Sequence, residues 1–379
     1  MRVFISAGEA SGDTHAAVVI QALNARFGTV QIDGIAGENM VRAGCNPLVH
    51  TRELSVMGVT DVLKALPRIR RIRDQVLGWA RENRPDVAIL VDYPGFHMRL
   101  GEALRKEGIP VIQYIAPKLW AWGERRVRRL SRSQDKLACI FPFEPQWFGE
   151  RGIKGEYVGN PSAAHAASGW SNSELKARLG VPDDHKLLAI LPGSRAGELS
   201  RHVPLLVDSW KRIRGEMQDV SAVVPRAPDV DLSALEPLTS QGVKLVDRLQ
   251  DGYAMRADAA IAASGTATLE LALWGVPTLL MYRASPLSMW IGLKLVKLKC
   301  VGLANILLGD KMIMPELIQN QASVPNICWH ALQLLAGGDA ANSQKRAFAE
   351  LSVMLGEGNP AERVAAMTSE LAGKDSRQA

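Results

Sequence analysis

Short apolar runs rich in β-branched residues alternate with longer amphipathic stretches along most of the chain. Such runs are typical of buried parallel strands, and the stretches between them are typical of helices. In the first half the predicted strands are Val3–Ala7, Asp86–Asp92, Val111–Ile115 and Lys136–Phe141, with helices such as Thr14–Phe27 and Leu100–Glu107 between them. The second half repeats the pattern, with strands at Leu187–Leu191, Val220–Val224, Lys244–Val246, Ala259–Ala263 and Thr278–Met281.

This alternation predicts an α/β protein made of two Rossmann-like, doubly wound domains. The polar stretch Gly159–His185 is the expected linker between a first domain at residues 1–165 and a second domain at residues 185–355. Ligands of such folds bind at the carboxyl ends of the strands, so we expect the two domains to face a central cleft.

The composition limits the possible binding partners and the cellular compartment of the protein. A net charge of +6 favours anionic partners, which include phosphorylated ligands, acidic lipid and nucleic acid. The four cysteines are scattered and form no CxxC pair, which is typical of a reduced, cytoplasmic protein. Lysines interrupt the most apolar region, Arg283–Gly309, so no run reaches the ~20 residues of a spanning helix. A predicted strand follows Met1 and Arg2 at once, so we expect no signal peptide.

A glycine turn with carboxylates and hydroxyls follows the first predicted strand. It reads Ser6-Ala7-Gly8-Glu9-Ala10-Ser11-Gly12-Asp13 and has neither the GxGxxG pattern nor a Walker lysine. Glu9 and Asp13 would repel a pyrophosphate, whereas the hydroxyl groups of a sugar suit them. An ordinary strand-to-helix turn, with Asp13 near the helix start, explains the motif equally well.

Asp92 lies at the end of the apolar run Val87–Val91, before Pro94 and Gly95. A carboxylate at the carboxyl end of a buried strand points toward the ligand side of the sheet, which makes Asp92 a candidate general base. The alternative is that Asp92 caps the turn that follows it.

Two glycine turns in the second half are candidate phosphate sites. In the first, Gly193 and Ser194 offer N–H and hydroxyl donors, and Arg195 can pair with phosphate oxygens. In the second, Ser264, Gly265 and Thr266 open a helix, with Glu270 one turn later on the same face. A cradle beside a carboxylate suits a nucleoside diphosphate with a ribose diol. The alternatives are a Pro-Gly turn with a solvated arginine and a capped helix with an acidic first turn.

Three segments combine arginine or lysine with apolar and tryptophan residues. They are Lys64–Arg84, Arg125–Arg132 after Trp120 and Trp122, and Pro286–Lys299. Each segment by itself also fits a solvated helix face. Together they predict contact with an anionic membrane surface.

No metal site is expected from the sequence. Asp229-Val230-Asp231 matches the DxD pattern of metal-dependent glycosyltransferases, but it lies in a loop and is interpreted as chance. The histidines show no paired spacing. We therefore expect no metal and no other cofactor.

With these residues in view, the sequence resembles the lipid-A-disaccharide synthase family of the glycosyltransferase-B superfamily. The resemblance covers nearly the whole chain and rests on seven motifs in order. They are Ser6–Asp13, Ser55–Gly58, Trp120–Trp122, Phe141–Glu144, Val158–Pro161, Leu191–Arg195 and Ser264–Glu270.

The resemblance implies a reaction. UDP-2,3-diacylglucosamine donates its sugar to 2,3-diacylglucosamine 1-phosphate at the cytoplasmic face of the inner membrane. The products are a β-1,6-linked disaccharide phosphate and UDP, the anomeric centre is inverted, and no metal takes part. The acceptor would bind the first domain and the UDP-sugar the second, with no nucleic acid involved.

The resemblance also assigns roles to residues. Asp92 matches the family's proposed base and Glu9 its loop glutamate, with Ser11 and Asp13 nearby as expected substrate contacts. Arg195 and Glu270 fall on the nucleotide side, and Asn305 matches an asparagine important in the family and is expected to bind substrate.

Two positions depart from the family pattern. His97 replaces an asparagine, which concerns acceptor positioning, and Ala304 replaces a proline. The resemblance further implies that a C-terminal helix at about 356–379 packs back on the first domain, and that some members form an intertwined homodimer.

Two other functions remain open from the sequence. A UDP-sugar 2-epimerase shares the fold and the nucleotide motifs, but it needs no lipid surface. A non-catalytic module that binds nucleotide-sugars or membranes would need neither Glu9 nor Asp92. Formation of UDP and a disaccharide from the lipid donor and acceptor separates the three.

Overall fold

The computed structural model describes residues 1–54, 59–166, 169–226, 230–247, 256–263, 265–285, 299–356 and 358–375. The chain divides into two compact units. The first unit comprises Met1–Ala164 and Glu357–Ala379, and the second comprises His165–Gly356.

The first unit contains a seven-stranded sheet in the order β3-β2-β1-β4-β5-β6-β7. All of its pairings are parallel. The order reverses between β1 and β4, where Ala7 pairs with Val91, and this is the point at which doubly wound sheets bind ligands. The strands are β1 (Arg2–Ala7), β2 (Gln31–Ala36), β3 (Asn46–His50), β4 (Val87–Val91), β5 (Val111–Tyr114), β6 (Lys136–Cys139) and β7 (Gly155–Tyr157).

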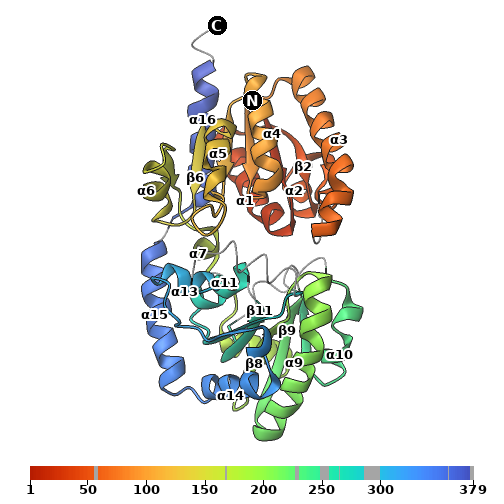
Figure 1. Ribbon diagram of the computed structural model, residues 1–379, viewed down its shortest axis with the longest axis vertical. Helices are drawn as coiled ribbons and strands as arrows, with labels where there is room; N and C mark the ends of the chain where they lie inside the picture. Colours follow the sequence, from red (N-terminus) through yellow and green to blue (C-terminus); the bar gives the residue numbers. More distant parts are fainter. Residues whose placement is uncertain are drawn as a thin grey trace. The chain divides into compact units, whose positions relative to one another are not determined.

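Helices cover both faces of this sheet. Apolar residues of α3 and α4 pack with Phe4 and Leu90 in one core cluster. The C-terminal α16 lies beside α1 and also contacts β4 and β5, so the end of the chain completes the first unit (Figure 1). The helices are α1 (Ala10–Phe27), α2 (Glu38–Arg42), α3 (Val59–Asn83), α4 (Pro94–Lys106), α5 (Val127–Ser133), α6 (Glu144–Gly149), α7 (Pro161–Ala166) and α16 (Pro360–Asp375).

The second unit contains a six-stranded parallel sheet in the order β10-β9-β8-β11-β12-β13. Its order reverses between β8 and β11. The strands are β8 (Lys186–Leu191), β9 (Val220–Arg226), β10 (Lys244–Asp247), β11 (Ala259–Ala263), β12 (Thr278–Tyr282) and β13 (Glu316–Ile318).

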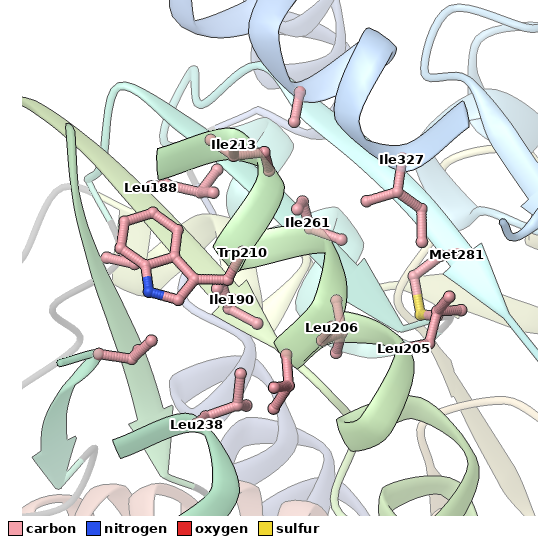
Figure 2. Close-up of a cluster of buried hydrophobic side chains, with 14 of the residues drawn as sticks. Leu188, Ile190, Leu205, Leu206, Trp210, Ile213, Leu238, Ile261, Met281 and Ile327 are labelled. Carbon is pink, nitrogen blue, oxygen red and sulfur yellow. The ribbon is translucent and has the colours of Figure 1, made fainter. Parts of the chain in front are cut away.

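The core of the second unit lies between this sheet and its long helices. Trp210 of α9 and Ile327 of α14 pack over Ile190, Ile261 and Met281 of the strands (Figure 2). The helices are α8 (Asn172–Leu179), α9 (Ala196–Glu216), α10 (Glu236–Thr239), α11 (Thr266–Leu273), α13 (Leu303–Leu307), α14 (Val324–Leu335) and α15 (Asp339–Leu355).

The predicted fold class is confirmed. Each of the nine predicted strands is present within one or two residues of its expected bounds, and β2, β3, β7 and β13 are additional. The expected linker Gly159–His185 is partly helical, because it contains α7 and α8. Leu175 of α8 is buried in a core cluster of the second unit, so that part of the stretch is integral to a folded unit.

Candidate active site

Glu9 and Asp92 lie at the same edge of the first sheet. Glu9 follows β1 as the N-cap residue of α1, and Asp92 follows β4. Because Ala7 at the end of β1 pairs with Val91 at the end of β4, both carboxylates emerge where the strand order reverses. The structure thus brings the candidate base Asp92 to the same edge as the loop glutamate Glu9.

Asp92 occupies an unusual backbone conformation. Its φ is 50° and that of Tyr93 is 48°, so two consecutive non-glycine residues lie in the left-handed region. Strain of this kind persists only where neighbouring contacts hold it, and it is concentrated at functional sites. Here the Asp92 N–H donates to the carbonyl oxygen of Tyr114 on β5 at 2.8 Å.

Burial raises the pKa of the Asp92 carboxyl to about 6. The nearby Lys118 ammonium opposes this rise, the Glu9 carboxylate adds to it, and the N–H of Tyr93 opposes it. A carboxylate with a raised pKa is a stronger base than an ordinary one and is still largely ionised near neutral pH. This chemistry suits the abstraction of a proton from a hydroxyl group.

Lys118 and Tyr93 are functional candidates that the sequence reading missed. Lys118 follows β5 on the same edge and is partly buried, but it belongs to no recognisable motif. The Tyr93 hydroxyl donates to the carbonyl oxygen of Leu54 at 2.7 Å. Its ring lies where a β-carbon on Gly8 would be, 2.1 Å from Tyr93 Cγ, so the glycine of the first motif makes room for this ring.

Ser11 and Asp13 have different surroundings. Ser11 is exposed on the first turn of α1. Asp13 is buried, and its carboxylate accepts the backbone N–H groups of Gly37 at 2.7 Å, Asn39 at 2.9 Å and Met40 at 3.2 Å. Asp13 therefore holds the start of α2, which is a structural task that the expected substrate contact did not anticipate.

In the second unit, Gly193–Arg195 follow β8 at the point where the strand order reverses. Ser194 and Arg195 are exposed, as a ligand-binding loop requires. Glu198 of α9 lies beneath this loop and accepts the N–H of Ser194 at 3.2 Å and of Arg195 at 3.4 Å. The Glu198 carboxylate thus already accepts from two of the N–H groups that were expected to bind phosphate. It also forms an ion pair with the Arg195 guanidinium at 3.3 Å.

The second expected phosphate turn follows β11, the neighbour of β8. Ser264 lies outside the described residues. Gly265 is the N-cap of α11, with no side-chain cap, and Thr266 is exposed beside it. Glu270 is partly buried one turn further along the same helix. The N-terminal amides of α11 are therefore placed to receive an anion.

Asn305 of α13 is completely buried, with an exposed fraction of 0%. Its amide nitrogen donates to the carbonyl oxygen of Met314 at 2.9 Å and to Glu316 Oε1 at 2.8 Å. Its oxygen accepts the N–H groups of Ile313 at 3.0 Å and Met314 at 2.8 Å. Both ends of the amide are committed to the protein, so Asn305 fixes the loop before β13 in this structure.

The basic segments divide between core and surface. In α3, Ile72, Val76 and Leu77 are buried in the core of the first unit, while Arg68 and Arg70 are exposed. Trp122 is 43% exposed, and the Arg126 guanidinium lies 4.3 Å from the centre of its ring. The third segment lies outside the described residues over 286–298. Among the described residues, no helix combines the length and the apolar character that crossing a bilayer requires.

Comparison with known proteins shows the family of this chain. A family model described as lipid-A-disaccharide synthetase matches residues 3–366. A lipid-A-disaccharide synthase from Myxococcus xanthus (strain DK1622) is 38% identical over 376 residues, which cover 98% of this chain and 97% of that protein.

Solved structures resemble the chain in fold. The UDP-GlcNAc 2-epimerase from Neisseria meningitidis bound to UDP-GlcNAc has a TM-score of 0.65 at 14% identity, covering 98% of this chain and 100% of that chain. The calicheamicin glycosyltransferase CalG4 has a TM-score of 0.60 at 14% identity, covering 98% of each chain. At such identity the likeness shows the fold and does not favour epimerisation.

The two sheets, the loops at their reversal points and these comparisons define a glycosyltransferase with the glycosyltransferase-B fold. More narrowly, the chain belongs to the lipid-A-disaccharide synthase family. The predicted family and enzyme class are thereby confirmed.

Proposed function

We propose that this enzyme transfers 2,3-diacylglucosamine from UDP-2,3-diacylglucosamine to 2,3-diacylglucosamine 1-phosphate, releasing UDP and the β-1,6-linked disaccharide phosphate. The observation that carries this proposal is the position of Asp92, beside Glu9, at the reversal point of the first sheet. Family membership supplies the reaction class.

In this proposal Asp92 is the general base. Inverting transfer is a single displacement, and the 6-hydroxyl of the acceptor attacks the anomeric carbon well only when a base takes its proton. The raised pKa of Asp92 suits that task. Glu9 shares the edge and orients sugar hydroxyl groups, together with the exposed Ser11.

UDP is assigned to the second unit. The N-terminal amides of α11 with Ser264, Gly265 and Thr266 receive the diphosphate, and Glu270 binds the ribose diol. Because Glu198 occupies the Ser194 and Arg195 amides, the exposed Arg195 guanidinium is the part of the first turn that meets phosphate. Asn305 supports this unit by fixing its loop.

The decisive experiment is incubation with both lipid substrates and detection of UDP and the disaccharide. Asp92→Asn keeps the shape of the side chain and removes its basicity, so turnover falls by about 10²–10⁴-fold. UDP binding to that variant remains unchanged, whereas Arg195→Ala weakens UDP binding by about 1.5–3 kcal/mol. Near-normal turnover in Asp92→Asn, beside a severe loss in Glu9→Gln, assigns the base to Glu9.

We further propose that the enzyme works at the anionic surface of the inner membrane. The exposed arginines of α3 and the exposed Trp122 support this. Binding to vesicles containing anionic lipid is expected at low salt and is expected to weaken at high salt, because screening reduces basic contacts. Indifference to such vesicles at low salt rejects the idea.

A further inference from the structure

His97 joins the ends of β1 and β4 through two short hydrogen bonds. It lies on the first turn of α4 and is completely buried, with an exposed fraction of 0%. Its Nδ1 lies 2.7 Å from the carbonyl oxygen of Asp92, and its Nε2 lies 2.8 Å from Ser6 Oγ on β1. The ring therefore connects the strand that precedes Glu9 with the residue proposed as the base.

The direction of both hydrogen bonds follows from their chemistry. A carbonyl oxygen only accepts, so Nδ1 carries a proton. Burial lowers the pKa of His97 to about 4, against the opposing effect of the backbone at Asp92 and Val91, so the ring is neutral at pH 7. Nε2 of a neutral ring with a protonated Nδ1 is an acceptor, and the Ser6 hydroxyl donates to it.

The bonded carbonyl belongs to the strained corner of the chain. Asp92 and Tyr93 both have a positive φ, and this left-handed conformation is unfavourable for a non-glycine residue. The Asp92 carbonyl also lies 3.3 Å from Gln113 Nε2 of β5, but His97 provides the shorter contact. Since the carboxylate direction of Asp92 follows from its backbone, the group that holds this carbonyl sets where the carboxylate points.

We propose that His97 is a positioning residue, whose Nδ1–H holds the Asp92 peptide in its left-handed conformation and thereby aims the carboxylate at the acceptor hydroxyl. This inference rests on the proposed function of Asp92 as the base. It gives His97, which departs from the family pattern, a specific task. A displacement of about 1 Å in a reacting group costs about 10²-fold in rate, which sets the scale of the expected effect.

Three substitutions at His97 test which nitrogen matters. Asparagine places its amide nitrogen near the position of Nδ1, glutamine places it near Nε2, and leucine supplies neither. We expect His97→Leu and His97→Gln to lower kcat by about 10²-fold while KM for the UDP-sugar changes by less than about twofold. His97→Asn should restore at least about tenfold over His97→Leu.

The pH profile of kcat is a second measurement, and a general loss of structure would not shift its acidic limb. Once the peptide relaxes, the Asp92 carboxyl is less buried and its pKa falls, so the acidic limb of kcat in His97→Leu moves to lower pH. Circular dichroism and UDP binding should stay as in the wild type. Ser133→Ala is the matched control, because it removes another buried hydroxyl of the first unit, bonded to Leu130 at 3.0 Å, and should leave kcat unchanged.

A double-mutant cycle separates this inference from the proposed function. If His97 acts through Asp92, His97→Leu causes no further loss in an Asp92→Asn background. Full activity of Asp92→Asn rejects Asp92 as the base. A large loss in Asp92→Asn beside normal kcat in His97→Leu rejects only the positioning role, as do additive losses in the double variant or a His97→Gln variant that matches His97→Asn.

Discussion

At the scale of single residues, the site is governed by the cost of placing charge on Asp92. Burial makes its ionisation costly, and the neighbouring Glu9 adds to that cost. Lys118 counteracts both effects from the loop after β5. The carboxylate thus combines a raised proton affinity with ionisation near neutral pH, and its pKa depends on a cation that no motif pointed out.

The first prediction concerns the pH dependence of turnover. Asp92 accepts a proton only when ionised, so kcat should rise with pH through an acidic limb near pH 6. Lys118→Met removes the charge that favours ionisation, so the limb should move to higher pH, whereas Lys118→Arg should leave it near 6. A kcat profile of the three proteins between pH 5 and about 9 measures this. An unmoved limb in Lys118→Met contradicts the coupling.

The second prediction concerns stability. The folded pKa of Asp92 lies above its ordinary value near 3.8, so the folded protein holds this proton more tightly than the unfolded chain does. The contribution of Asp92 to the free energy of unfolding of the wild-type protein therefore falls as pH rises from about 4 to about 6, and it remains lower above that range. Asp92→Asn should raise the melting temperature at pH 8 and raise it less at pH 4.

Thermal melts at both pH values test this, with the exposed Asp183→Asn as a control that should shift little. A lower melting temperature for Asp92→Asn at pH 8 runs against the expectation. The combination of higher stability and lower turnover is typical of a strained active-site residue.

At the scale of elements, buried polar residues hold loops of both units in place. Asp13 fixes the start of α2, Glu198 fixes the turn after β8, and Asn305 fixes the loop before β13. Glu144 of the fourth motif is buried and accepts the N–H groups of Ile140 and Phe141. A conspicuous polar residue near the end of a strand can therefore anchor a loop, so its presence alone does not indicate a ligand contact.

The third prediction separates these roles for Asp13. Asp13→Ala leaves buried N–H donors of Gly37 and Met40 without their acceptor, which costs about 1–3 kcal/mol. Denaturant unfolding should show that loss, while KM for both substrates stays within about twofold. Ser11→Ala, at the exposed neighbouring site, should show the reverse pattern. A large KM change in Asp13→Ala without lost stability restores the substrate-contact reading.

The predictable elements were those with continuous apolar runs, since strands buried on both faces consist of little else. The missed β2 contains Asp33 and Gly34, which interrupt that pattern. Both have tertiary causes: Asp33 accepts from Asn46 of β3 at 2.7 Å, and a β-carbon on Gly34 would lie 1.8 Å from the carbonyl oxygen of Ile5. β13 has only three residues, too few for a periodic signal.

The site was predictable to the same extent. Asp92 was found because it directly follows an apolar strand, and Glu9 because it lies in the glycine turn after another. The bond between Ser6 and His97 joins residues 91 positions apart, and only the sheet order brings them together. No local pattern could show that both the nitrogen and the oxygen of the Asn305 amide are hydrogen-bonded to the segment 313–316.

At the scale of the whole molecule, the chain leaves the first unit, builds the second and returns. α16 lies after all the strands of the second unit, yet it packs on α1, β4 and β5 of the first. Val364, Met367 and Thr368 of α16 are almost fully buried. The first unit is therefore completed only by the last residues of the chain.

The last prediction follows from this connection. Ending the chain after Leu355 removes α16, whose buried Val364, Met367 and Leu371 each contribute about 1.5–3 kcal/mol. It also uncovers the surface of α1 on which α16 packs. Since that loss is comparable to the whole stability of a domain, we expect the first unit to lose cooperative unfolding and transferase activity to disappear.

UDP should still bind the truncated protein, because the second unit keeps its own core and both of its turns. Arg363→Ala is the control: it removes the exposed ion pairs of α16 with Glu156 of β7 and with Glu370 of α16 itself, worth about 0–1 kcal/mol, and should preserve activity. Calorimetric melting, UDP titration and turnover of the three proteins measure the outcome. A truncated chain that keeps its turnover would show that the first unit does not need α16. Loss of UDP binding together with turnover would show that α16 also supports the second unit.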